Sequence, residues 1–295
     1  MSKTKQTHVP VLLHEVLDYL APQAGKSFLD LTAGLGGHAG AVIELTTAPG
    51  RTTLIDRDPE AVRVLRKKFV DVEILQSDFR SALEKLARQG KRYDIILADL
   101  GVSSLHLDSG LRGFSFLRSG PLDMRLDANQ ALTAEKIVNT WSETDLADIL
   151  KGYGEEKKSR AIAKNIVLNR PVHTTSQLAD IVAKSYRFRS KIHPATKTFQ
   201  ALRIAVNDEL KQLAHSLPLI LEVLAPGGRL AVISFHSLED RLVKNFLAEN
   251  SGTLDAQLQI LTKKPITASA SEIVSNPRAR SAKLRAAVKI KTRPL

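Results

Sequence analysis

The sequence predicts an α/β fold, in which a Rossmann-like and mostly parallel sheet carries an antiparallel edge strand and is interrupted by an all-helical domain. Three observations lead to this prediction. Short apolar runs alternate with helical patterns as far as residue 99, the strand pattern is missing from residues 104–195, and strands return near the end of the chain. We therefore expect a discontinuous domain, residues 1–103 and 196–295, with residues 104–195 inserted as a helical domain.

The first predicted strand, residues 27–31, leads into a glycine turn and then into a helix that His38 opens. The turn contains Gly34, Gly36 and Gly37. Glycine lets the chain turn sharply and brings backbone N–H groups close to a ligand, and the N-terminus of the helix would point at the same place. Glycine turns after strands are common, so this motif alone leaves a purely structural role open.

The second predicted strand, residues 51–55, is followed by Asp56, which lies 20 positions after Gly36. At this spacing, a carboxylate at the end of the second strand accepts hydrogen bonds from ribose hydroxyls. The first part of the chain therefore predicts a site for an adenosine-containing molecule.

Two more strands complete the parallel pattern before the insertion. A helix begins at Pro59, residues 72–75 form the third predicted strand, and residues 93–98 form the fourth, which is followed by Asp99. Ligands of open α/β sheets bind at the carboxyl ends of the strands. Asp56, Asp99 and the residues after the third strand should consequently lie along one edge of the sheet.

The rest of the chain divides into a helical part and a final strand-rich part. The loop at residues 108–121 is long and rich in Ser, Gly and Arg, which is typical of functional or disordered segments. Helices are predicted at 142–151, 155–170, 175–187, 199–213 and 218–224, and strands at 229–234, 257–262 and 283–290. The last two strands are joined without a predicted crossover helix, so they should form the antiparallel edge.

The charge of the chain, +12 at pH 7, is concentrated in two stretches. Residues 151–203 contain twelve Lys and Arg against three acids, and residues 276–295 contain seven against none. A solvated helical surface and a frayed tail would explain this, but a polyanionic partner such as nucleic acid explains the clustering better. Zero cysteines, no apolar run of membrane-spanning length and no visible signal peptide fit a cytoplasmic protein.

The motifs distinguish between the possible adenosine cofactors. A nicotinamide dinucleotide usually requires G-x-G-x-x-G, whose third glycine is Ala39 here, and ATP usually requires G-x-x-x-x-G-K-[ST], which is absent. The G-x-G-G turn, the late antiparallel edge and the two strand-end acids favour S-adenosylmethionine. Asp56 would then hold the ribose, Asp78 or Phe79 would contact the adenine, and Asp99 would face the methyl group.

Several ordered segments resemble the bacterial small-subunit (16S) ribosomal RNA cytosine-N4 methyltransferases, from end to end of the chain. These segments are His8-Val9-Pro10-Val11-Leu12, Gly36-Gly37-His38, Ile55-Asp56-Arg57-Asp58, Asp99-Leu100-Gly101-Val102-Ser103-Ser104, Gly113-Phe114-Ser115-Phe116, Gly120-Pro121-Leu122-Asp123-Met124-Arg125, Ile192-His193-Pro194-Ala195-Thr196, Phe199 to Leu210, Gly227 to Arg241 and Asn276 to Arg285.

This resemblance implies a class I methyltransferase fold, S-adenosylmethionine as the cofactor, and ribosomal RNA, within an assembled small subunit, as the partner. It implies that cofactor contacts fall on Gly36, Gly37, His38, Asp56, Phe79, Asp99 and His106. The chain departs from the family at two places. Leu105-His106 stands where Pro-Gln is common, and Leu31 stands where a smaller residue is usual.

The acceptor would be the exocyclic amine of cytidine, whose lone pair is delocalised into the ring. Asp99 would accept hydrogen bonds from this amine. Because the usual aromatic residue is missing after the fourth strand, we expect Phe235 and His236 to serve as further catalytic residues, with Phe114 and Phe116 as second candidates for stacking on the base. Core packing and a structural hydrogen bond are the alternatives for Phe235 and His236.

We expect no metal site, because His236 and Glu239 lack a third ligand at helical spacing. Three other functions remain open: a methyltransferase for another nucleic acid, a nicotinamide-dependent oxidoreductase, and a non-catalytic RNA-binding protein that retains the fold. A homo-oligomer is also compatible with the sequence.

Overall fold

The computed structural model describes residues 10–101, 112–116, 119–186, 193–252 and 255–290. The chain forms two compact units, one made of residues 1–101 and 211–295 and the other of residues 102–210. We call them the sheet unit and the helical unit. Within the described residues, no helix is long and apolar enough to cross a membrane.

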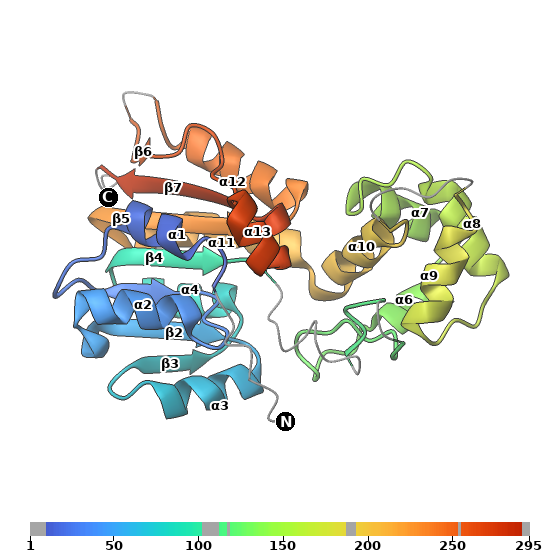
Figure 1. Cartoon of the computed structure of the whole chain (residues 1–295), viewed down its shortest axis with the longest axis horizontal. Helices are drawn as coiled ribbons and strands as arrows, with labels where there is room; N and C mark the ends of the chain where they lie inside the picture. Colours follow the sequence, from blue (N-terminus) through green and yellow to red (C-terminus); the bar gives the residue numbers. More distant parts are fainter. Residues whose placement is uncertain (1–9, 102–111, 117–118, 187–192, 253–254, 291–295) are drawn as a thin grey trace. The chain divides into compact units, whose positions relative to one another are not determined.

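The sheet unit is built around one seven-stranded sheet (Figure 1). Its strands lie in the order β3 (Glu73–Gln76), β2 (Thr52–Asp56), β1 (Phe28–Asp30), β4 (Tyr93–Asp99), β5 (Leu224–Ser234), β7 (Lys283–Lys289) and β6 (Leu258–Ile260). The first five of these are parallel, β7 pairs antiparallel with β5, and β6 pairs antiparallel with β7. The predicted Rossmann-like sheet with an antiparallel edge is therefore confirmed.

Helices cover both faces of this sheet, because successive side chains of a strand point to opposite faces and both sets are apolar. In β4, Ile95 and Leu97 belong to one buried core, and Ile96 and Ala98 belong to the other. The first core is covered by α1 (Leu13–Leu20), α2 (Gly37–Thr46) and α3 (Pro59–Lys68), and the second by α4 (Phe79–Arg88), α11 (Glu209–Val223) and α12 (Ser237–Glu249).

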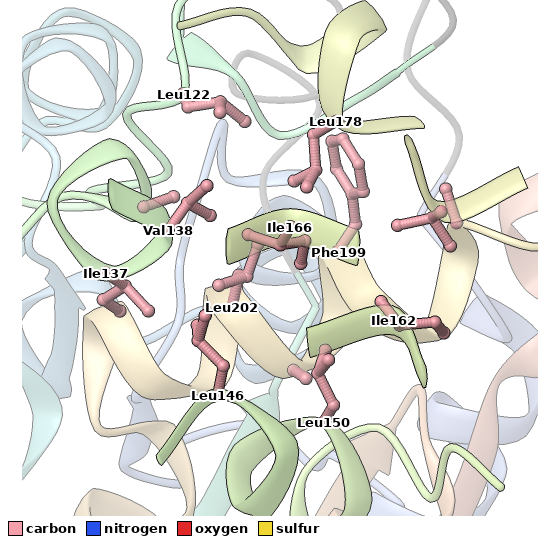
Figure 2. Close-up of a cluster of buried hydrophobic side chains, with 14 of the residues drawn as sticks. Leu122, Ile137, Val138, Leu146, Leu150, Ile162, Ile166, Leu178, Phe199 and Leu202 are labelled. Atoms are coloured by element: carbon pink, nitrogen blue, oxygen red, sulfur yellow. The ribbon is translucent and has the colours of Figure 1, made fainter. Parts of the chain in front are cut away.

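The helical unit has its own core, which several short helices share. They are α6 (Ala134–Thr140), α7 (Glu143–Gly152), α8 (Ser159–Leu168), α9 (Thr175–Ala183) and α10 (Thr196–Asn207). Figure 2 shows their apolar side chains converging, among them Val138, Leu150 and Ile166. Since each short helix can bury only one face alone, this shared core is what stabilises them.

Several helices of this unit begin at a residue whose side chain accepts a hydrogen bond from a backbone N–H of the first turn. The predicted cap at Ser142 is confirmed, since its Oγ accepts a hydrogen bond from the Asp145 N–H at 3.1 Å. Thr174 and Gln177 form a capping box at the start of α9. The helix α6 and its cap at Thr133 were not predicted from the sequence.

The second boundary between the two units lies later in the chain than the sequence predicted. The sequence analysis assigned residues 196–210 to the discontinuous domain, but α10 packs Phe199 and Leu202 into the helical core, and the units divide after Leu210. The break predicted before Pro218 is also absent, because α11 continues through this proline.

Strand β5 begins earlier than predicted. Its pairing with β4 is shifted between Tyr93, which lies opposite Leu224, and Ile95, which lies opposite Arg229. The segment 225–228, which lies between the predicted helix 218–224 and the predicted strand 229–234, is thus an irregularity within the strand. Residues 258–260 and 283–289 form the two last strands, close to the predicted ranges.

Candidate functional site

Three neighbouring strands of the sheet unit each end in an aspartate: Asp30 ends β1, Asp56 ends β2 and Asp99 ends β4. Because β1 lies between β2 and β4 and all three are parallel, these carboxylates share one edge of the sheet. The sequence analysis selected Asp56 and Asp99 and did not select Asp30. Its signal was present in the sequence, since Asp30 is the polar residue within the apolar run of strand one.

Asp56 is held by backbone groups on two sides. Its Oδ2 accepts a hydrogen bond from the Gly34 N–H at 2.8 Å, and its Oδ1 accepts one from the Asp58 N–H at 2.8 Å. These two bonds fix the orientation of the Asp56 carboxylate, and its contact with the ribose stays a prediction.

The glycine turn is closed on one side and open on the other. A Cβ built at Gly36 would lie 2.5 Å from the Phe69 ring, and one at Gly37 would lie 2.6 Å from Pro10. Gly34 is different, since within the described residues a Cβ there would meet only the Thr32 carbonyl oxygen, at 3.9 Å. Packing of the protein itself thus requires glycine at 36 and 37, and the room beside the turn lies at Gly34.

The turn also depends on backbone conformations that favour glycine. Gly34 has φ 53° and Gly36 has φ 70°, which are left-handed values. Lys68 donates a hydrogen bond from its Nζ to the Gly36 carbonyl at 2.7 Å. Predicted cofactor contacts at Gly36 and Gly37 would have to use their backbone atoms, and these contacts stay a prediction.

His38 is buried at the start of α2 and bridges two parts of the sheet unit. Its Nε2 lies 2.9 Å from the Val11 carbonyl oxygen, which can only accept, so Nε2 carries a proton. Its Nδ1 lies 3.7 Å from Oδ2 of Asp99. The structure consequently brings together His38 and Asp99, two residues that the sequence analysis selected from separate motifs.

Asp99 is partly exposed and is anchored through its backbone. Its N–H donates a hydrogen bond to Thr32 Oγ1 at 2.6 Å, and its Oδ1 accepts a long one from the Gly101 N–H at 3.4 Å. Thr32 in turn donates its backbone N–H to Asp30 Oδ1 at 3.0 Å. Thr32 therefore connects the end of β1 to the end of β4 and positions Asp99 relative to Asp30.

Asp30 lies deepest of the three acids, fully surrounded by the sheet unit. Burial raises its pKa to about 7; the Thr32 N–H bond opposes this change, and the nearby charges of Asp99 and Asp56 add to it. The Asp30 carboxyl therefore titrates near neutral pH, beside the carboxylates of Asp56 and Asp99.

Fewer interactions of the other predicted cofactor-binding residues are seen in the structure. Phe79 is the first residue of α4 and packs partly against the sheet core, while Asp78 caps this helix by accepting from the Ser81 N–H at 2.9 Å. The adenine contact assigned to these residues stays a prediction. His106 lies outside the described residues.

Phe235 and His236 follow the end of β5, the strand beside β4. A Cβ built at Gly101 would lie 2.6 Å from the Phe235 ring, so this ring packs directly on the backbone that follows Asp99. His236 is the N-cap of α12 and accepts from the Glu239 N–H through its Nδ1 at 3.3 Å. The structural roles that the sequence analysis kept as alternatives are therefore present, and the catalytic roles stay predictions.

The donor set of this edge fits S-adenosylmethionine. Its sulfonium and amino groups are cationic, and the carboxylates of Asp30, Asp56 and Asp99 offer the opposite charge. The room at Gly34 lies directly beside the Asp56 oxygen that its N–H binds.

The basic C-terminal segment, residues 276–295, is less available to a partner than its composition indicates. Arg285 is buried and donates from Nε to Asp240 Oδ1 at 2.6 Å, and Lys283 lies 3.4 Å from the same carboxylate. Lys289 is also buried, and its Nζ donates to the carbonyl oxygens at the end of α11. Arg285 and Lys289 are therefore used within the protein, and binding of RNA phosphates by the rest of this segment stays a prediction.

Comparison with known proteins identifies the family of the chain. The model of the MraW methylase family matches residues 5–290. A ribosomal RNA small subunit methyltransferase H of Trichormus variabilis is 48% identical over 292 residues, which cover 96% of this chain and 92% of that protein. A protein of the same name from Cyanothece sp. is 49% identical over 285 residues, covering 96% and 95%.

A solved structure, described as a putative rRNA-methylase from Clostridium thermocellum, has a TM-score of 0.47 and 12% identity, and covers 96% of this chain and 100% of that one. The two sequence relatives and the family model confirm the resemblance noted in the sequence. The chain therefore belongs to the MraW methylase family, a family of S-adenosylmethionine-dependent methyltransferases, and the predicted cofactor is confirmed at this level.

Proposed function

We propose that the protein transfers the methyl group of S-adenosylmethionine to the exocyclic N4 amine of a cytidine in small-subunit (16S) ribosomal RNA. The observation that carries this proposal is the group of carboxylates at the ends of β1, β2 and β4, beside the open side of the glycine turn. The relatives named as small-subunit rRNA methyltransferases support the choice of substrate. A ribosomal substrate would place the reaction in the cytoplasm.

The reaction requires little acid–base chemistry from the protein. The sulfonium already activates the methyl group, and the methylated amine loses its extra proton readily to water. The main contribution is in-line placement of the amine nitrogen behind the S–CH₃ bond, an effect of about 7–11 kcal/mol at best. Asp99 accepts hydrogen bonds from the amine, which aligns the nitrogen lone pair with this bond.

Asp99 suits this role because its backbone is fixed while its carboxylate lies at the strand end. Thr32 anchors its backbone, and the carboxylate remains partly exposed at the strand end. Its bond from the Gly101 N–H is long, so this oxygen can exchange it for a shorter bond from a substrate amine.

The helical unit supplies a candidate RNA surface along α8. Arg160 and Lys164 are exposed and lie four residues apart on one side of α8, and Lys157 is exposed just before the helix begins. The sequence of α8 contains no acidic residue. We assign this basic stripe to the RNA phosphates, because it lacks internal countercharges within its own helix.

The first test is tritium transfer from labelled S-adenosylmethionine into small ribosomal subunits that lack base methylation, followed by nucleoside analysis. We expect the label in N4-methylated cytidine, and Asp99→Ala should abolish it. Asp94→Ala is the matched control, since Asp94 lies at the other end of the same strand, and it should retain transfer.

Label in another nucleoside would contradict the proposed acceptor atom. Absence of label in RNA, with donor binding detected by calorimetry, would contradict the proposed substrate, and DNA would be the next acceptor to test. Absence of both transfer and donor binding would favour a non-catalytic RNA-binding protein.

The RNA surface has a separate test. Replacing Lys157, Arg160 and Lys164 by alanine should weaken binding of small-subunit RNA and reduce the salt dependence of its affinity by roughly 0.7 to 0.9 log units for each phosphate that the variant no longer binds. Replacing three exposed lysines of the sheet unit, Lys91, Lys263 and Lys264, is the control for the change in net charge. Equal effects of the two sets of changes would contradict a specific role of α8.

A further inference from the structure

Glu239 lies in the first turn of α12 and is almost completely buried. Its Oε2 accepts hydrogen bonds from two consecutive backbone groups, the Phe235 N–H at 2.9 Å and the His236 N–H at 3.3 Å. These are the two residues that follow the end of β5. One buried carboxylate oxygen therefore determines the path of the chain where it leaves the sheet.

The His236 side chain in turn binds the backbone of Glu239. Its Nδ1 accepts from the Glu239 N–H, so Nδ1 carries no proton and the neutral ring has its proton on Nε2. That Nε2 lies 3.1 Å from Oε1 of Glu239. The two side chains bind each other's backbone reciprocally, which holds both in a single conformation.

The segment that Glu239 fixes is in contact with the end of β4. The Phe235 ring packs against Gly101, close enough that a Cβ there would lie 2.6 Å from the ring. Asp99 is only two residues earlier and pairs with Ile233 of β5. A displacement of Phe235 would consequently be transmitted to the backbone that carries the Asp99 carboxylate.

We propose that Glu239 is a positioning residue for methyl transfer: it holds Phe235 against Gly101 and thereby keeps the strand end with Asp99 in the geometry of the reaction. This inference rests on the function proposed above. It assigns Glu239 no contact with substrate or cofactor and no proton transfer. Its contribution is to accept hydrogen bonds from the backbone N–H groups of Phe235 and His236.

The helical unit contains a matched control for this arrangement. At the start of α9, Gln177 Oε1 accepts from the His173 N–H at 2.9 Å and the Thr174 N–H at 3.1 Å, as Glu239 does from the two residues before α12. The uncharged amide of Gln177 thus accepts the same kind of paired backbone hydrogen bonds as the Glu239 carboxylate. Gln177→Ala removes equivalent bonds from the other unit.

The experiment compares Glu239→Ala, Glu239→Gln and Gln177→Ala for the kcat and KM of methyl transfer to small-subunit particles and for donor affinity by calorimetry. We expect Glu239→Ala to lower kcat by about tenfold to a hundredfold, as small misplacements of reacting groups do, with unchanged donor affinity. Glu239→Gln should recover part of kcat, because its amide oxygen accepts the same two backbone bonds while its NH₂ group meets the Nε2–H of His236. Gln177→Ala should leave kcat unchanged.

A kcat of Glu239→Ala equal to that of the wild type would overturn the inference, as would an equal loss in Gln177→Ala. Gly101→Ala is the independent variant, since its Cβ displaces the Phe235 ring while Glu239 is intact, and it should also lower kcat. Wild-type protein without transfer to RNA would contradict the proposed function instead.

Discussion

Asp30 allows the electrostatics of the site to be tested by a single substitution, Asp30→Asn. Burial, opposed by the Thr32 N–H bond and reinforced by Asp99 and Asp56, raises the pKa of Asp30 from 3.8 to about 7. Asparagine has a similar shape and its Oδ1 can still accept from the Thr32 N–H, but it has no charge. The substitution therefore removes the titration and retains the hydrogen bond.

The expected magnitude follows from this pKa. Below pH 3.8 Asp30 is protonated in both the folded and the unfolded chain, so its ionisation does not affect stability. Between about pH 4 and 7 the unfolded chain releases the proton and the folded chain keeps it, so the free energy of unfolding falls as pH rises. Above pH 7 the loss is complete and amounts to about 4 kcal/mol, at about 1.4 kcal/mol for each pKa unit.

The assay is urea unfolding of wild type and Asp30→Asn at several pH values, without cofactor. The variant should become progressively more stable relative to wild type, by about 3 kcal/mol between pH 5 and pH 8. Asp94→Asn provides a contrast: burial opposes its ionisation, but bonds from Ser27 and Lys26 lower its pKa overall, so its contribution appears above pH 3.8 and is lost in acid. A difference between Asp30→Asn and wild type that is constant with pH would refute the reasoning.

Three further substitutions test other parts of the structure by urea unfolding. Gly36→Ala should cost about 1–2 kcal/mol from its left-handed backbone alone, with a further loss from the clash with Phe69, whereas an unchanged stability would contradict the packing described for the turn. Asp240→Asn leaves Arg285 buried without its partner charge and should cost about 3 kcal/mol, so a neutral effect would show that this arginine reaches solvent. Ser142→Ala should cost about 1 kcal/mol because α7 is left without its cap, and Ser142→Thr should restore most of it.

The fold and part of the site could be predicted because they depend on periodicity and spacing along the chain. Asp56 and Asp99 were identified as strand-end residues because the apolar runs before them define where β2 and β4 end. Since the carboxyl ends of parallel strands share one edge, the sequence alone placed these residues together.

Other features depend on tertiary packing, which composition does not reveal. Lys289 and Arg285 counted as free positive charges in the sequence, but the structure uses them to bind the end of α11 and Asp240. The reason for glycine at position 36 is Phe69, which a motif centred on ligand binding does not predict. The role of Glu239 required knowledge of where the β5 and α12 backbones meet.

The acidic edge of the sheet also explains the choice among adenosine cofactors in physical terms. Three carboxylates on adjacent strand ends repel one another, and the raised pKa of Asp30 reflects part of this cost. A pyrophosphate placed there would add to the repulsion, whereas a sulfonium and an ammonium group would relieve it. A nicotinamide dinucleotide is thus disfavoured by the same residues that suit S-adenosylmethionine. The third acid, Asp30, strengthens this discrimination beyond what Asp56 and Asp99 provide, because it ends β1, the strand between β2 and β4.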